Sequence, residues 1–383
     1  MYASTRLLTS LGLLCALVPA CFNASDSGVG DDGMLDEGST GDLTDAGDDA
    51  TPDPQPDPDP GTTTGAPDPD GTTTGPADDS GGDTDPDPTT GGEVEDTTAP
   101  TVLMSAPADG DIGVAADVVM SVTFSEPMNK ASVQAAYQST DIPDLFVTMS
   151  WNAAGDQLII TPSNELLLGT GTSSVDITPR SYAFTITTAA TDLAGNELEQ
   201  DVPIEFTMLN RIHEQIDLLG ALSGRVREDG NTAFGFIQAG DSGNPPNAQY
   251  RGFASFPMYD LPADIVEITE ANLLSTQYAV AGSPYTDLGD LQIHDIEFFT
   301  LGLESFSAPS LGNLGVLSNS TANGQRALDV TAAVIDDYEA GSDTTQFAYQ
   351  FPLTTNLDSG ADYVLFYGED SPATVLDIEY LLP

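Results

Sequence analysis

The side chains that usually carry acid–base or metal chemistry are scarce in this sequence. Its 383 residues include only two histidines, His213 and His294, and two cysteines, Cys15 and Cys21. A zinc site takes three or four protein ligands, and the sequence has no HExxH, GxSxG or phosphate-loop pattern. Paired carboxylates of a glycosidase cannot be recognised among so many acids. The sequence therefore favours a non-catalytic protein, with a polysaccharide-degrading enzyme in the C-terminal region as the less favoured alternative.

Charge narrows the range of partners. Sixty-one acidic residues stand against eight basic ones, which gives a formal net charge of −53. Such a chain repels nucleic acids and anionic lipid headgroups. We therefore expect no nucleic-acid partner, and we expect neutral or cationic ligands and divalent cations instead.

The N-terminus has the pattern of an export signal. A single Arg6 precedes an apolar run over 7–20, which is shorter than the roughly 20 residues that span a membrane. Val18-Pro19-Ala20-Cys21 resembles the lipobox of bacterial lipoproteins, with a proline as its one departure. The resemblance implies a signal peptide at 1–20 and lipid on Cys21; the alternative is an ordinary signal with an incidental cysteine. Phe22 is not the aspartate that retains such proteins at the inner membrane, so we expect a lipid anchor in the outer membrane or at the cell surface.

Residues 21–98 read as a tether. This stretch is rich in Asp, Pro, Thr and Gly and contains the imperfect repeat PDPDPGTTTG and PDPDGTTTG. Low hydrophobicity combined with like charge cannot offset the entropy lost on ordering. We predict a disordered acidic linker that spaces the folded part from the membrane.

Residues 99–208 alternate apolar and polar side chains in short runs separated by turn residues. Strands are predicted at 118–124, 158–161, 182–186 and 202–206, which indicates an all-β sandwich. The segments DTTAPTVLMSAPADGDIGV, VTFSEPMN and YAFTITTAATDLAGNEL resemble the bacterial Ig-like domain of surface proteins. That resemblance implies a spacer or a weak adhesion unit without catalysis.

Two features of this first unit have competing interpretations. Glu126, Asp192 and Asn196 offer oxygen ligands for a structural calcium ion, or they simply cap loops. Trp151, the only tryptophan, is expected in the core rather than on a sugar-binding surface.

Residues 209–383 again read as strands and turns. Strands are predicted at 232–238, 271–280, 292–299, 346–353, 362–367 and 374–381, and one short helix at 329–338. The segments YRGFASF, LPADIVEITEANL, RALDVTAAV, QFAYQFPL and ADYVLFYGEDSPATVLDIEY resemble, in this order, the DNRLRE-type β-sandwich. This family is related to carbohydrate-binding modules that accompany polysaccharide-degrading enzymes.

The DNRLRE resemblance implies a ligand-binding site. Arg251 has two possible roles under this resemblance. Relatives that bind acidic polysaccharide use lysine and arginine, and Arg251 lies in the matching RG motif; alternatively, it neutralises a buried carboxylate. Because the chain is so acidic, neutral glycan on tyrosine rings is the more plausible ligand. The candidate rings are Tyr250, Tyr278, Tyr285 and Tyr367.

Together these observations predict an all-β protein: a disordered acidic N-terminal linker, an Ig-like β-sandwich at 99–208, and a jelly-roll-like β-sandwich with one short helix at 209–383. We expect a surface-anchored lipoprotein whose second sandwich binds carbohydrate or another surface component. The main alternative is a structural or adhesion protein with protein partners. The sequence leaves the ligand and the oligomeric state open.

Overall fold

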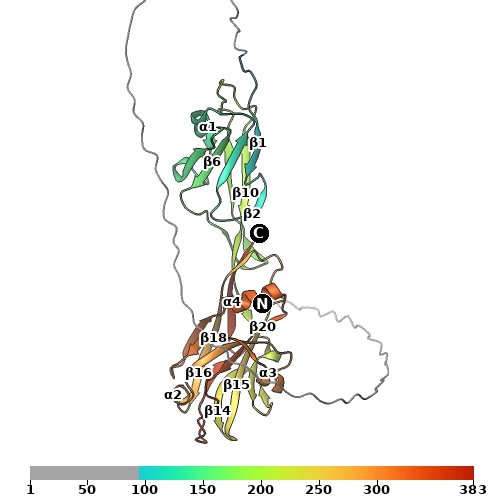
Figure 1. The fold of residues 1–383 in the computed structure, drawn as a ribbon, viewed down its shortest axis with the longest axis vertical. Coiled ribbons are helices and arrows are strands. Elements are labelled where there is room, and N and C mark those ends of the chain that lie inside the picture. Colours follow the sequence, from blue (N-terminus) through green and yellow to red (C-terminus); the bar gives the residue numbers. More distant parts are fainter. Residues whose placement is uncertain (1–94) are drawn as a thin grey trace, which may run out of the picture. The chain divides into compact units, whose positions relative to one another are not determined.

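The computed structural model describes residues 95–383. The predicted signal peptide, the lipidation at Cys21 and nearly all of the tether lie outside these residues. The predicted all-β fold, with an Ig-like sandwich followed by a second sandwich, is confirmed for the described part (Figure 1).

The first sandwich consists of two four-stranded sheets. One has the order β1 (Val102–Ala106), β3 (Met120–Phe124), β6 (Gln157–Pro162) and β5 (Val147–Trp151). The other has the order β2 (Asp111–Val114), β10 (Val202–Met208), β9 (Ser181–Ile186) and β4 (Tyr137–Gln138). The helix α1 (Lys130–Ala136) precedes β4, and Asn129 caps its first amides.

Alternating burial explains why these segments form strands. Met120, Val122 and Phe124 are at most 1% exposed, whereas the residues between them are half-buried. One face of β3 therefore supplies the core between the sheets. Trp151 stacks on Phe124 with ring centroids 6.1 Å apart, as the expected core packing requires.

The second sandwich contains the remaining strands. They are β7 (Gly169–Ser173), β8 (Asp176–Thr178), β11 (Asn210–Asp217), β12 (Gly224–Arg227), β13 (Thr232–Ala233), β14 (Phe236–Gly243), β15 (Pro246–Pro257), β16 (Glu267–Ala281), β17 (Leu291–Ile296), β18 (Ser310–Ser318), β19 (Gly324–Asp329), β20 (Thr344–Gln350), β21 (Tyr363–Tyr367) and β22 (Val375–Leu382). β7 and β8 come from within the predicted Ig-like range and join this sheet through the parallel pairing of β7 with β11.

The long strand β15 connects two layers. Its residue Tyr250 pairs with Gly240 of β14, whereas Gly252 pairs with Tyr349 of β20. We call the layer of β18, β17, β20, the second half of β15, β12 and β13 sheet I. Sheet II comprises the first half of β15 with β14, β21, β16, β22, β11, β7 and β8, and β19 pairs with β16.

The two layers meet in an apolar core that also contains hydrogen-bonded polar side chains. The rings of Tyr349 in sheet I and Phe366 in sheet II lie 5.5 Å apart. The Tyr349 hydroxyl is 2.5 Å from Ser275 Oγ, which is 3.0 Å from Thr374 Oγ1. This buried hydroxyl is thus satisfied inside the core, as buried polar groups must be.

The predicted helix at 329–338 is confirmed as α4 (Thr331–Ala340), which ends at Gly341 with a left-handed φ of 70°. The structure adds two shorter helices, α2 (Pro284–Asp287) and α3 (Leu303–Ser307). The continuous strand predicted at 232–238 is wrong, because Gly235, at φ 84°, separates β13 from β14. Among the described residues, no helix has the length and apolar character needed to cross a membrane.

Candidate ligand-binding faces of the second sandwich

Sheet II carries a row of aromatic side chains on the face turned away from the core. Phe236 of β14 pairs directly with Tyr367 of β21, and Gly240 pairs with both Tyr363 and Tyr250. Directly paired residues share a face, as do residues four apart on one strand. The core-facing neighbours Ile237 and Val364 are fully buried on the opposite side. We define the aromatic face as Phe236, Tyr250, Tyr278, Tyr363 and Tyr367.

Tyr278 joins this face through a local irregularity of β16. The register between β16 and β21 shifts between Gln277 and Ala279. At this bulge the Tyr278 ring stacks on Tyr367, with centroids 4.4 Å apart and planes inclined by 28°. Both rings are partly exposed, so they present a continuous apolar surface to solvent.

The cation of Arg225 lies at one edge of the aromatic face. The Arg225 guanidinium lies over the rings of Tyr250, at 4.6 Å, and Phe236, at 5.7 Å. Burial opposes ionisation of Tyr250, but hydrogen bonds with Ser242 and Arg225 outweigh it and lower the pKa of the phenol. Because Tyr250 is only 7% exposed, it supports the surface rather than contacting a ligand.

The four predicted tyrosines therefore have different positions. Tyr278 and Tyr367 come together at the surface, and Tyr250 lies beneath Arg225. Tyr285 lies elsewhere: its ring packs on Phe351 at 5.7 Å, and its hydroxyl donates to Gln277 Oε1 at 2.5 Å. Burial raises the pKa of Tyr285.

Sequence analysis missed two members of the face, Phe236 and Tyr363. The signal for Tyr363 is present in the sequence, because Tyr363, Leu365 and Tyr367 alternate with the buried Val364 and Phe366. Phe236 gave no comparable signal, because Gly235 interrupts the pattern before it.

Arg251 lies on sheet I, in a pocket of about 380 Å³ that it shares with His294. Its Nη1 donates to the Phe306 carbonyl oxygen at 2.8 Å, and its guanidinium lies 4.9 Å from the Phe306 ring. Burial lowers the pKa of Arg251. Within residues 95–383, the ion pairs involve Arg211, His213 and Arg227, and none involves Arg251. The expectation that Arg251 neutralises a buried carboxylate is therefore wrong.

His294 has neutral partners in the same pocket. Its Nδ1 lies 2.9 Å from Ser310 Oγ, and its Nε2 lies 3.3 Å from Gln292 Oε1. Burial, and secondarily the charge of Arg251, lowers the pKa of His294. A serine nucleophile needs a base that becomes an imidazolium and a carboxylate that stabilises it. His294 therefore has a hydroxyl partner in Ser310, and an amide rather than a carboxylate at its other ring nitrogen.

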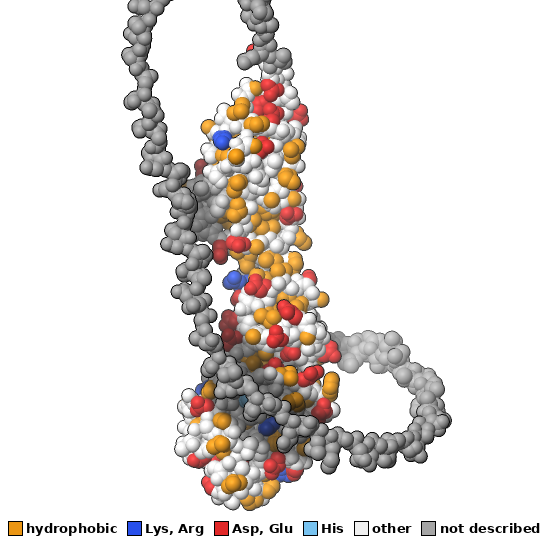
Figure 2. All heavy atoms as spheres, viewed as in Figure 1, with side chains coloured by type: hydrophobic (Ala, Val, Ile, Leu, Met, Phe, Trp, Pro, Cys, Tyr) orange, Lys and Arg blue, Asp and Glu red, His pale blue; other side chains and the backbone are white. Residues whose placement is uncertain are grey.

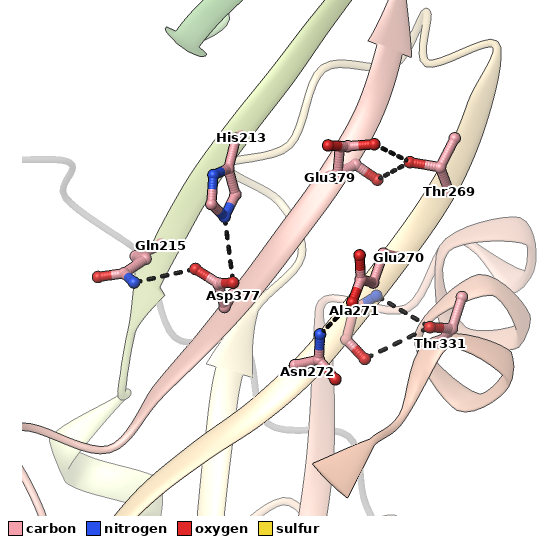
Figure 3. Close-up of polar contacts among 9 residues, drawn as sticks. All are labelled: His213, Gln215, Thr269, Glu270, Ala271, Asn272, Thr331, Asp377 and Glu379. Atoms are coloured by element: carbon pink, nitrogen blue, oxygen red, sulfur yellow. Dashed lines mark hydrogen bonds and ion pairs between the residues drawn. The ribbon is translucent and has the colours of Figure 1, made fainter. Parts of the chain in front are cut away.

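His213 belongs to a polar surface of sheet II (Figure 3). Its Nε2 lies 3.1 Å from Asp377 Oδ2, and Gln215 Nε2 donates to Asp377 Oδ1 at 2.9 Å. The hydrogen bond with Asp377 raises the pKa of His213. On the neighbouring strand Thr269 donates to Glu379. These contacts link neighbouring strands across the exposed face of the sheet.

The first sandwich brings together the carboxylates considered for calcium. Glu126 and Asp192 lie with Asp96 so that one oxygen of each is within 4.8 Å of the others. Burial, followed by the charges of Asp96 and Asp192, raises the pKa of Glu126. Such a set of oxygen donors fits calcium. Sequence analysis missed Asp96, because this acid lies at the end of the acid-rich tether.

Asn196 braces this cluster rather than adding an oxygen to it. Its Nδ2 donates to Asp192 Oδ2 at 2.8 Å and to the Asp96 carbonyl oxygen at 3.0 Å. Burial disfavours the Asp192 carboxylate, but hydrogen bonds from Asn196 and Gly195 prevail and lower its pKa. The loop-capping role considered for Asp192 and Asn196 is thus present in the structure.

Comparison with known proteins identifies the first sandwich. Residues 96–208 match the family described as "Bacterial Ig-like domain", so this part of the chain is such a domain. No curated protein matches the chain. The DNRLRE resemblance of the second sandwich stays a prediction.

Two solved structures are similar to this chain at low sequence identity. Domains 1–6 of the surface layer protein SbsC match with 13% identity and a TM-score of 0.20, over 61% of this chain and 32% of that one. SGBP-B, from a complex xyloglucan utilization locus in Bacteroides uniformis, matches with 9% identity and a TM-score of 0.21, over 74% of both chains. The chain thus spans about a third of the surface layer protein structure that it matches.

Proposed function

We propose that this chain is an exported, non-catalytic lipoprotein that displays a glycan-binding sandwich at the outer membrane or cell surface. In this proposal lipid on Cys21 anchors the chain, residues 21–98 form a spacer, and the bacterial Ig-like domain extends it. The second sandwich, related to the DNRLRE type, carries the binding site on its aromatic face.

The stacked pair of Tyr278 and Tyr367 is the observation that carries this proposal. Contiguous exposed apolar surface is a feature of ligand-binding and interaction sites, and these two rings lie together on the solvated face of the sheet. Sugar rings present flat C–H faces that pack on aromatic rings, and each such contact is worth about 1 kcal/mol. Phe236 and Tyr363 extend the same surface on neighbouring strands.

A neutral glycan suits this surface better than an anionic one. Acidic side chains are spread over the visible face of the described residues, and basic ones are few (Figure 2). On sheet II itself Asp377 and Glu379 project from β22, next to the strands of the aromatic face. Stacking requires no charge on the ligand, whereas an anionic chain would be repelled along most of its length.

The non-catalytic part of the proposal rests on the surroundings of the two histidines. His213 is paired with Asp377 on an exposed sheet, and His294 lies beside Arg251, which disfavours its protonation. Within the described residues His213 has no hydroxyl or thiol partner and His294 has no carboxylate partner, so neither histidine forms a nucleophile–base–carboxylate arrangement. For the Asp96, Glu126 and Asp192 cluster we propose a structural role, in which bound calcium relieves the mutual repulsion of the three carboxylates.

A glycan array probed with the full chain tests the proposal. Binding to neutral glycans that resists added salt is the expected result, because stacking is not an electrostatic interaction. Binding to no glycan, with and without calcium, would remove the carbohydrate function. Release of products from a bound polysaccharide would show an enzyme instead.

A further inference from the structure

The pocket on sheet I is distinct from the aromatic face. It is lined by side chains of β15, β17 and β20 and by the segment 306–310. Its volume of about 380 Å³ lies at the lower end of the range for small-molecule sites. The pocket therefore has room for a small ligand and none for a branched sugar chain.

Specific contacts hold the chain around residue 306, where the lining segment 306–310 begins. Phe306 packs with Val226 and Phe253 in a separate apolar cluster beneath α3. The Phe298 amide donates to the buried Gln346 Oε1 at 2.8 Å, and Ser305 donates to the Gly302 carbonyl oxygen at 2.9 Å. These contacts preorganise the pocket, which reduces the entropy lost when a ligand binds.

The positive charge of Arg251 determines that the pocket favours an anionic ligand. Among the described residues the pocket is lined by Arg251 and by no aspartate or glutamate, in a chain with a net charge of −53. Of the five N–H donors of Arg251, the only hydrogen bond formed within the described residues is the one to Phe306, and its buried Nε has no acceptor. A partly buried cation without a counter-ion is costly, and one bound anion would offset that cost.

The remaining lining specifies the kind of anion. His294, Ser310 and Gln350 add neutral polar groups, and Ile296, Ala308 and Ala348 add apolar surface. One guanidinium matches a single negative charge, and its Nη2, which forms no hydrogen bond within the described residues, is the donor left for a carboxylate. We propose that this pocket binds a small monocarboxylate, with its carboxylate on Arg251 and its short alkyl body against the apolar lining. This proposal uses no residue of the aromatic face and stands independently of glycan binding.

The two histidines make the test direct. Propanoate is titrated into the full chain while the imidazole NMR signals are followed, and the chain has only two of them. We expect a saturable shift of the His294 signal, with a dissociation constant of about 1 mM or below, and an unchanged signal from His213 on sheet II. Propanamide, which has the same shape without the charge, should cause no shift.

Three results would overturn the proposal: an unchanged His294 signal at saturating propanoate, an equal shift with propanamide, or an equal shift with sulfate. Arg251→Met should weaken propanoate binding at least about tenfold. Arg211→Met, which removes the same charge from an exposed ion pair with Glu379, should leave it unchanged. If Arg251→Met does not fold, the titration of the unmodified chain decides alone.

Discussion

The ring of Tyr278 stacks on the ring of Tyr367 with centroids 4.4 Å apart, although the two residues belong to different strands, β16 and β21. The register shift in β16 beside Tyr278 accompanies this contact. Phe236 lies directly opposite Tyr367 on the next strand and continues the aromatic face. A feature of local strand geometry thus accompanies the stacking of two aromatic rings from neighbouring strands.

Asp295 should make stability depend on pH. Burial, followed by repulsion from Asp337, raises the pKa of Asp295 to about 6. A carboxyl whose pKa is raised on folding destabilises the folded state when it is ionised. The free energy of unfolding therefore rises as pH falls from the folded pKa toward the unfolded pKa, near 4. Asp295→Asn should therefore raise the free energy of unfolding at pH 7.5 by about 1 kcal/mol, after allowance for partial exposure, and by less near pH 4.5.

Urea denaturation at the two pH values measures this effect. Asp290→Asn, at an exposed position, changes the net charge equally and serves as the control. An equal gain at both pH values, or an equal gain in the control, would show that general charge reduction rather than Asp295 is responsible.

His294 should link carboxylate binding to pH. Burial and the charge of Arg251 lower the pKa of His294, which favours the neutral imidazole. Of the residues 95–383 that line the pocket, Arg251 is the one that carries a permanent charge. Propanoate should raise the pKa of His294, and its affinity should increase as pH falls from 7.5 to about 6. NMR titration of the imidazole with and without propanoate measures both; an unchanged midpoint would contradict the shared pocket.

Calcium should stabilise the first sandwich through Glu126. At a hundredfold excess over its dissociation constant, a ligand adds about 2.7 kcal/mol, which corresponds to several degrees in Tm. Glu126→Gln should remove most of this gain, whereas the exposed Glu165→Gln should retain it. Calorimetry with calcium and with EDTA makes the comparison. An equal rise in Tm on adding calcium to the two variants would show that the ion binds at other acidic residues of the chain.

Cys21→Ser should release the protein from the membrane. The substitution removes the sulfur to which lipid would be attached, and a single acyl-bearing residue is the only anchor that the sequence predicts. Fractionation of cells into membrane and medium gives the result. Cys15→Ser, within the predicted signal peptide, is the matched control and should leave the protein on the membrane. Retention of Cys21→Ser would contradict lipid anchoring.

The strands were predictable because alternation of apolar and polar residues reports directly on a half-buried sheet, as for Met120, Val122 and Phe124. Contacts between strands distant in sequence were not predictable. The contact of Tyr278 with Tyr367 depends on which strands are neighbours in the sheet. The approach of Asp96 to Asp192 depends on the path by which the chain enters the first sandwich, which composition does not specify. Arg251 was identified from its motif, but only its surroundings reveal that no acid accompanies it.

The most direct test of glycan binding on the aromatic face is calorimetric titration of the full chain with the best neutral glycan from the array. Tyr278→Ala and Tyr367→Ala should each weaken binding roughly fivefold, since each lost ring contact is worth about 1 kcal/mol. Tyr259→Ala removes a tyrosine that is 61% exposed outside this face and should leave the affinity unchanged. Unchanged affinity in both face variants, with their folds intact, would contradict the assignment of the glycan site to this face.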